Sequence, residues 1–140
     1  MKIPLIIRNL PPLGSHIFVR GNIDSKKVLW LIDTGASQSV IDKTFVSTYF
    51  QDNIISETEH QTTGLGATYE KSEFVRLKNL QIGKFKITSK KFAVIDLDIV
   101  NAAYVSAGMP RIEAIIGGDI LKKYKAIINY SKKEFTLNNS

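Results

Sequence analysis

Short β-type runs separated by turn residues constrain the fold of this sequence more than any other feature. The runs are rich in Val, Ile, Phe and Thr and are broken by Gly and Asn, a pattern typical of strands joined by tight turns. Ser15–Ile23 and Lys26–Ile32 are predicted to form a hairpin that turns near Asp24-Ser25. The other strands are predicted over Ile54–Thr62, Thr68–Leu77, Leu80–Ile82, Lys86–Ile95, Lys125–Tyr130 and Lys133–Leu137. The pattern therefore predicts an all-β fold.

Three short segments depart from the strand pattern and are predicted to be helical. Asp42–Phe50 spaces its aromatic residues at helical intervals, and Asp42 is placed to cap the first turn. Asp98–Ala107 contains alanines and could form one or two helical turns, and Gly118–Tyr124 carries apolar residues on one side. No Pro/Gly/Ser linker divides the 140 residues. We therefore expect one domain over residues 1–140.

The predicted strand Val28–Ile32 consists of apolar residues and ends abruptly on an acid. Burying a charge is costly unless it is paired, so a carboxylate at the end of a core strand calls for an explanation. Thr34 and Gly35 follow Asp33, and a glycine lets the backbone pass close to the carboxylate. The alternative interpretation is a strand followed by an ordinary Asx-type turn.

A second motif lies far downstream, where the aliphatic residues Ile115 and Ile116 precede Gly117 and Gly118. A glycine after a buried strand allows one backbone to approach another closely. Alone, this motif is equally compatible with a strand that ends in a glycine turn.

The chain resembles the retropepsin-like aspartic protease family. The resemblance lies in the order of four features: the two motifs, the short helix and the strand near Ala126–Tyr130. The similarity is greatest to the bacterial single-domain members and extends from about Ile17 to Leu137. The resemblance implies an acid-protease fold, a closed β-barrel or sandwich with a flap hairpin and one to three short helices. It also implies the activity of an aspartic endopeptidase with no cofactor and an extended peptide or protein as substrate.

The resemblance assigns roles to individual residues. Asp33 would be the catalytic acid, Thr34 would form a hydrogen-bond lock between two loops of a dimer, and Gly35 would shape the loop. Ile116 and Gly117 would support that loop, and together with Ala36 and the flap tip they would line the substrate cleft. The flap-tip residues assigned to substrate binding are Thr63, Gly64, Leu65 and Gly66.

The flap corresponds to the predicted hairpin whose tip spans Thr62–Ala67. Gly64 and Gly66 permit positive φ and easy opening, which a lid requires. The alternative is an ordinary exposed hairpin. The Gly-x-Gly of this tip is not a nucleotide-binding fingerprint, because no helix is predicted to follow it.

One Asp-Thr-Gly per chain implies two chains. Aspartic peptidases activate water with two carboxyl groups close enough to share one proton. Neither Asp24 nor Asp119 is followed by the residues of a second such loop. The simplest source of the second carboxyl group is therefore another copy of Asp33 across a two-fold axis, which predicts a homodimer.

Two other functions remain open at this point. The first is a dimeric scaffold that binds peptides and cleaves them weakly or not at all. The second is a basic nucleic-acid-binding β-barrel, because the formal net charge is +6. The lysines occur in short groups beside turns, which is typical of solvated edges and makes nucleic-acid binding the weaker alternative. These groups are Lys26-Lys27, Lys90-Lys91, Lys122-Lys123 and Lys132-Lys133.

The sequence offers little support for other catalytic chemistry. It has no cysteine, which excludes thiolate catalysis and thiolate metal sites. His16 and His60 have no acid or serine at a suggestive spacing. Asp96 and Asp98 would share one face of a strand, but without an evident third ligand we interpret them as a solvated strand end and expect no metal.

The sequence shows neither a secretory signal nor a membrane-spanning segment. The first apolar run is interrupted by Pro4 and ended by Arg8, which does not fit a secretory signal. No segment approaches the roughly 20 apolar residues of a membrane span. We therefore expect a cytoplasmic protein without a membrane partner.

Overall fold

The fold is built mainly from strands. The computed structural model describes residues 1–63 and 66–139, and the side chains outside residues 58–71. The strands are β1 Lys2–Pro4, β2 Ile6–Asn9, β3 Ser15–Ile23, β4 Lys26–Ile32, β5 Val40–Asp42, β6 Ile54–Thr63, β7 Gly66–Ile82, β8 Phe85–Ile95, β9 Ala114–Ile116, β10 Ile127–Asn129 and β11 Glu134–Thr136. The helices are α1 Lys43–Tyr49, the 3-10 helix η1 Gln51–Asn53, α2 Asp98–Ser106 and α3 Gly118–Lys123. The all-β prediction with a few short helices is confirmed.

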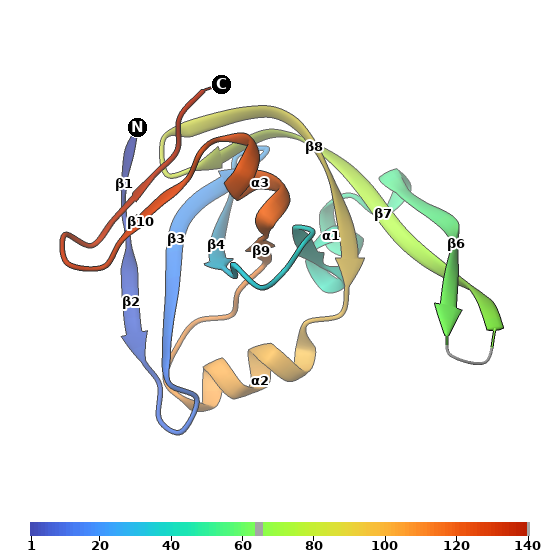
Figure 1. Ribbon diagram of the computed structural model, residues 1–140, viewed down its shortest axis with the longest axis horizontal. Coiled ribbons are helices and arrows are strands. Elements are labelled where there is room, and N and C mark those ends of the chain that lie inside the picture. The colour runs from blue at the N-terminus through green and yellow to red at the C-terminus, as the bar shows by residue number, and fades with distance from the viewer. Residues whose placement is uncertain (64–65, 140) are drawn as a thin grey trace.

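The main sheet closes on itself. Its strand order is β2-β3-β4-β9-β5-β8-β7-β6, and an additional pairing between β3 and β7 joins the two sides. The pairs β4–β9 and β5–β8 are parallel, whereas the hairpins are antiparallel. The structure is therefore a closed barrel, as Figure 1 shows, with α2 beneath it and the β6–β7 hairpin projecting to one side.

The predicted hairpin of β3 and β4 has the bounds that the sequence indicated. Asp24 and Ser25 both adopt positive φ, 47° and 68°, which is the conformation of a two-residue turn that matches the twist of its strands. In contrast, the predicted break between Leu77 and Leu80 is absent, and β7 runs through it. Asn79 has a positive φ of 56°, but β8 pairs with residues on both sides of it and keeps the strand continuous.

The capping prediction for Asp42 is wrong. Asp42 precedes α1, but its side chain makes no capping hydrogen bond. It is 3% exposed, and its Oδ1 accepts a hydrogen bond from the Leu97 N–H at 3.1 Å. The carboxylate is turned away from the helix because the loop before α2 offers it a buried donor.

Two apolar clusters hold the fold together. The larger cluster fills the barrel and includes Trp30, Phe92 and Phe135, which are fully buried. The smaller cluster lies between the barrel and α2 and includes Phe18, Leu97 and Tyr104. Burial of Tyr104 in the smaller cluster fixes α2 beside the end of β4, so that this helix contributes to the site described below.

The two ends of the chain meet in a separate sheet with the order β1-β11-β10. Lys2 pairs with Thr136, and Ile3 pairs with Phe135. Figure 1 shows the N- and C-termini on the same side of the barrel. Across residues 1–63 and 66–139, no helix has the length and apolar composition needed to cross a membrane.

Candidate active site

Asp33 stands directly after β4, where the central strand leaves the barrel. Its backbone N–H donates to the Ile116 carbonyl at 3.0 Å, which continues the parallel pairing of β4 with β9. Its carboxylate Oδ1 accepts a hydrogen bond from the Gly35 N–H at 2.9 Å. A Cβ on Gly35 would lie 3.3 Å from that oxygen, closer than ordinary van der Waals contact. Because Gly35 has no side chain, the Asp33 carboxylate has room to lie beside the Gly35 amide.

The loop that carries the carboxylate is open to solvent in the single chain. Asp33, Thr34 and Gly35 are all exposed. Within the described part of the chain, Asp33 Oδ2 and the Thr34 hydroxyl have no hydrogen-bond partner. Both groups are free to bind a substrate, water or a second protein chain.

Gly117 fits tightly against this loop. A Cβ at Gly117 would lie 2.8 Å from the Ala36 carbonyl oxygen and 2.9 Å from the backbone of Gln38. The next residue, Gly118, donates its N–H to the same Ala36 carbonyl at 2.7 Å. The structure thus brings the two sequence motifs together, with Ile116 and Gly117 buried behind the exposed Asp33 loop.

Ser39 and Asp119 fasten the two motifs to each other. The Ser39 hydroxyl donates to Asp119 Oδ1 at 2.6 Å and accepts from the Gly117 N–H at 2.9 Å. The Ser39 N–H lies 3.0 Å from Asp119 Oδ2, and Lys90 Nζ lies 2.8 Å from the same oxygen. Ser39 was not singled out from the sequence, and Lys90 was interpreted only as one of the solvated lysines, because both are far from Asp119 along the chain.

These contacts favour the charged form of Asp119. Burial alone would raise the pKa of its carboxyl group, but the hydrogen bonds from Lys90, from Ser39 and from the Ile120 amide outweigh burial. The pKa of Asp119 therefore lies below its ordinary value. Asp119 acts as a charged anchor behind the loop, distinct from the exposed carboxylate of Asp33.

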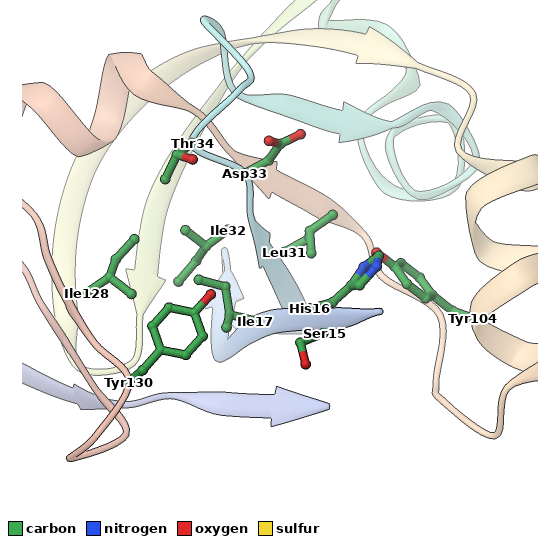
Figure 2. A pocket seen from close by; sticks show the side chains of 10 residues that line it. All are labelled: Ser15, His16, Ile17, Leu31, Ile32, Asp33, Thr34, Tyr104, Ile128 and Tyr130. Carbon is green, nitrogen blue, oxygen red and sulfur yellow. The ribbon is translucent and has the colours of Figure 1, made fainter. Parts of the chain in front are cut away.

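A cavity of about 470 Å³ opens beside Asp33. Figure 2 shows the side chains that line it, with Asp33 and Thr34 at one edge, Tyr130 across from them, and His16 with Tyr104 at the far side. The remaining lining residues are Ser15, Ile17, Leu31, Ile32 and Ile128. Apart from Asp33, no acidic residue of the described chain lines this cavity.

His16 and Tyr104 form a hydrogen-bonded pair in this cavity. His16 Nδ1 lies 2.7 Å from the Tyr104 hydroxyl oxygen, and the two rings meet edge to face with centroids 5.4 Å apart. Tyr104 is 2% exposed, and burial, followed by the nearby negative charge of Asp33, raises its pKa above 10.0. His16 has no acid or serine at a suggestive spacing in the sequence, so its pairing with Tyr104 was not predicted.

The position of His16 beside Asp33 could have been predicted from the register of the β3–β4 hairpin. β3 and β4 pair from Ile23 with Lys26 up to Phe18 with Leu31. Continuing the same register by two residues sets His16 opposite Asp33. A two-residue turn at Asp24-Ser25 fixes this register, so the proximity followed from the predicted turn.

The predicted flap tip is only partly described. Thr63 and Gly66 pair with each other at the end of the β6–β7 hairpin. Gly64 and Leu65 lie outside the described residues. The hairpin itself is continuous from Ile54 paired with Val75 to this final pair.

Asp96 and Asp98 gain a third acidic neighbour in the structure. The carboxylates of Asp42, Asp96 and Asp98 lie within 4.8 Å of one another. Arg111 Nη2 lies 3.3 Å from Asp98 and 3.7 Å from Asp42, and the Asp98 N–H donates to Asp96 at 2.9 Å. The two aspartates lie at the start of α2 and not on one face of a strand, and Arg111 offsets part of their charge.

Comparison with protein families identifies the arrangement. A family model described as aspartyl protease matches residues 19–120, a span that includes the Asp33 loop, Gly117 and Asp119. The chain belongs to the aspartyl protease family. No curated protein matches the sequence of this aspartyl protease.

Solved structures share the fold of this aspartyl protease at low sequence identity. A retropepsin-like aspartic protease from Rickettsia conorii superposes with a TM-score of 0.59 and 19% identity, covering 99% of this chain and 94% of the other. The retroviral protease-like domain of Ddi1 from Leishmania major gives a TM-score of 0.55 and 19% identity, covering 88% of each chain. The predicted retropepsin-like fold is confirmed.

Proposed function

We propose that the protein is a homodimeric aspartic endopeptidase that hydrolyses peptide bonds with an Asp33/Asp33′ pair. The observation that carries this proposal is the presentation of Asp33. Its carboxylate projects from the end of β4, with one oxygen held by Gly35 and the other without a partner in the described chain, beside a cavity. Membership of the aspartyl protease family supports the same chemistry.

The second carboxyl group must come from another chain. Asp33 is the sole acidic residue that lines the cavity within the described residues, and the anchored carboxylate of Asp119 is engaged by Ser39 and Lys90. A two-fold axis beside the exposed loop would bring two Asp33 side chains together. The free Thr34 hydroxyl would then donate or accept a hydrogen bond across that axis.

The reaction follows from two carboxyl groups that share one proton. Like charges this close do not both ionise readily, so one carboxyl group keeps its proton. The ionised Asp33 takes a proton from a water molecule, and this water attacks the peptide carbonyl carbon. The protonated Asp33′ donates a hydrogen bond to the carbonyl oxygen and stabilises the charge that develops there.

The substrate would be an extended segment of a peptide or protein. The cavity wall beside Asp33 combines polar side chains with an apolar part that includes Ile17, Leu31 and Ile32. A peptide can add to such a cleft as a strand, with main-chain hydrogen bonds providing affinity and pockets selecting alternate side chains. The projecting hairpin of β6 and β7 would act as the flap that closes over it.

The decisive experiment compares the wild type with Asp33→Asn on a library of extended, apolar-rich peptides. Asparagine keeps the shape and the hydrogen-bonding capacity but cannot act as a base, and in a homodimer the substitution removes both carboxylates. We expect cleavage by the wild type and background activity in the variant. Asp24→Asn, at the opposite end of β4, is the matched control and should cleave like the wild type.

The other outcomes separate the alternatives. Equal cleavage by the wild type and Asp33→Asn, or loss of activity in a chelator, would show that Asp33 is not the catalytic group. Binding of peptides without any cleavage would favour the scaffold, and binding of nucleic acid with a steep salt dependence would favour the basic β-barrel.

A further inference from the structure

His16 has an unusual position among the residues that line the cavity, because both of its ring nitrogens face hydrogen-bond acceptors. Nε2 lies 3.1 Å from the Leu13 carbonyl oxygen, and Nδ1 lies 2.7 Å from the Tyr104 hydroxyl oxygen. A carbonyl only accepts, so Nε2 must carry a proton in every charge state. A hydroxyl both donates and accepts, so Nδ1 is satisfied with or without a proton.

This arrangement tolerates both charge states of His16. In the neutral ring, Nδ1 has no proton and accepts a hydrogen bond from the Tyr104 O–H. In the imidazolium, Nδ1–H donates to the Tyr104 oxygen, and the tyrosine proton is released to point elsewhere. The contact between Nδ1 and the hydroxyl oxygen is therefore kept in both charge states, with donor and acceptor exchanged, whereas a lysine or arginine in place of the hydroxyl could only donate.

The surrounding charges are few. From β4, Asp33 lies beside the same cavity. From β2, Arg8 is the cross-strand partner of His16 but is exposed to solvent. From α2, Tyr104 is the titratable neighbour, and Tyr130 lies across the cavity. Histidine is also the side chain whose charge ordinarily changes between about pH 5 and 8.

We propose that His16, positioned by Tyr104, is a specificity-determining residue whose charge selects the substrate side chain bound beside Asp33. The neutral ring offers no free donor, and with Leu31 and Ile17 it forms a wall suited to uncharged side chains. The imidazolium adds a positive charge, and the released Tyr104 O–H adds a donor, so the same wall accepts an acidic side chain. This inference rests on the proposed peptidase function.

Peptide pairs that differ only by Glu or Gln at one position test the proposal. The substitution is placed in turn at each of the three residues on either side of the scissile bond. Between about pH 5.5 and 8 the glutamate stays charged, because its ordinary pKa is about 4.3. The ratio of kcat/KM for the Glu peptide to that for the Gln peptide cancels the titration of the catalytic pair, since both substrates meet the same enzyme at the same pH.

We expect this ratio in the wild type to rise about two- to fivefold from the upper to the lower pH at one position, the effect of a partly exposed ion pair. His16→Gln can accept from Tyr104 and donate to Leu13 but cannot become charged, so its ratio should be constant. His16→Arg is always charged, and its ratio should be high at every pH. Circular dichroism of each variant checks that it is folded.

Tyr104→Phe tests the positioning role separately. It keeps the ring that packs against His16 but removes the hydroxyl whose released O–H adds a donor to the wall, so the rise in the ratio should be smaller than in the wild type. A pH curve identical to that of the wild type overturns the role of Tyr104. A wild-type ratio that is flat, or that varies equally in His16→Gln, overturns the proposal while leaving the peptidase function intact. A wild type that cleaves no peptide overturns both.

Discussion

Gly117 and Gly118 adjoin in the sequence, but only Gly117 lies where a side chain would collide with the Asp33 loop. A methyl group at Gly117 would meet backbone atoms of Ala36 and Gln38 at 2.8–2.9 Å, whereas one at Gly118 would be 3.5 Å from its nearest neighbour. We expect Gly117→Ala to lower the free energy of unfolding by about 1–3 kcal/mol. It should also lower kcat/KM at least about tenfold by displacing the loop.

Gly118→Ala is the matched control for this prediction. It adds the same methyl group at ordinary contact distance and at the start of α3, where alanine is a good helix former. Urea unfolding and steady-state kinetics on both variants provide the measurement. Equal effects of the two substitutions would contradict the idea that Gly117 is required for the close packing of the loop.

Asp119 should give the stability of the fold a specific dependence on pH. Its pKa in the folded protein lies below the ordinary value of 3.8. The stabilisation from this group is therefore fully present above pH 3.8 and is lost as the pH falls through the lower folded pKa. Asp119→Asn should lower the free energy of unfolding by about 1–3 kcal/mol near neutral pH, and this difference should shrink as the pH falls.

Urea unfolding of the wild type and Asp119→Asn over a range of acidic pH values measures the effect. Asp52→Asn, which removes an exposed carboxylate in η1, is the control and should leave the curve nearly unchanged. A constant difference between Asp119→Asn and the wild type at every pH would mean that the charge of Asp119 is not what stabilises the loop.

At the level of residues, the sequence predicted the parts of the candidate site that are contiguous in the chain, but not the contacts between distant residues. Asp33, Thr34 and Gly35 were visible as candidates because an acid and a glycine directly follow an apolar strand. The bonds that join Ser39 and Lys90 to Asp119 span long stretches of chain, and polar pairs of this kind leave no periodic pattern. The pairing of His16 with Tyr104 depends on the packing of α2, which the local sequence does not determine.

Among the elements, the hairpin of β6 and β7 carries the main functional prediction. Replacing Gly64 and Gly66 by valine should penalise the backbone conformations that glycine permits in a tip. We expect slower turnover or a higher KM, with little change in the free energy of unfolding, because a lid acts during closure and not in the core. Steady-state kinetics together with urea unfolding measure both quantities.

Asp24→Val is the matched control for the hairpin. It imposes a β-branched residue at a positive φ of 47° in the β3–β4 turn, at the far end of β4 from Asp33. This variant should lose stability but keep its kinetic constants once folded. Unchanged kcat and KM in the glycine variant would show that the β6–β7 hairpin is not a flap.

The sequence predicted elements well where turn chemistry defined them. Asp24-Ser25 fixed the β3–β4 hairpin because both residues tolerate positive φ. The short strands β1, β2 and β5 were not predicted, since three or four residues carry little periodicity. Their pairing partners decide their conformation. β5, for example, pairs with β8 and β9 on its two sides.

For the whole molecule, the proposed dimer makes a prediction about mixtures of chains. If Asp33 is contributed by both chains, adding an equal amount of Asp33→Asn chain and allowing exchange should lower the activity per wild-type chain by about half, because half of the wild-type chains then sit in mixed dimers. A titration of the variant into the wild type measures this. Asp24→Asn chain, added in the same way, should not lower it.

Light scattering on the same mixtures, with and without a substrate-like inhibitor, gives the mass of the assembly. Activity that stays proportional to the wild-type chain alone, whatever the amount of Asp33→Asn added, would show that each chain works independently. A strictly monomeric protein that cleaves peptides would lead to the same conclusion.

The way in which Asp119 holds the Asp33 loop also has a consequence for biosynthesis. Ser39 is bound by a residue 80 positions later in the chain, and β4 acquires its parallel neighbour only with β9. Contacts this distant raise the contact order. Such chains fold slowly, because the entropy cost of closing a long loop arises before the paired strands stabilise the structure. Until β9 and Asp119 have left the ribosome, the Asp-Thr-Gly loop of the nascent chain therefore lacks the contacts that fix its conformation. We expect the Asp33 loop to gain its final geometry, and with it any activity, only after the residues up to Asp119 have emerged.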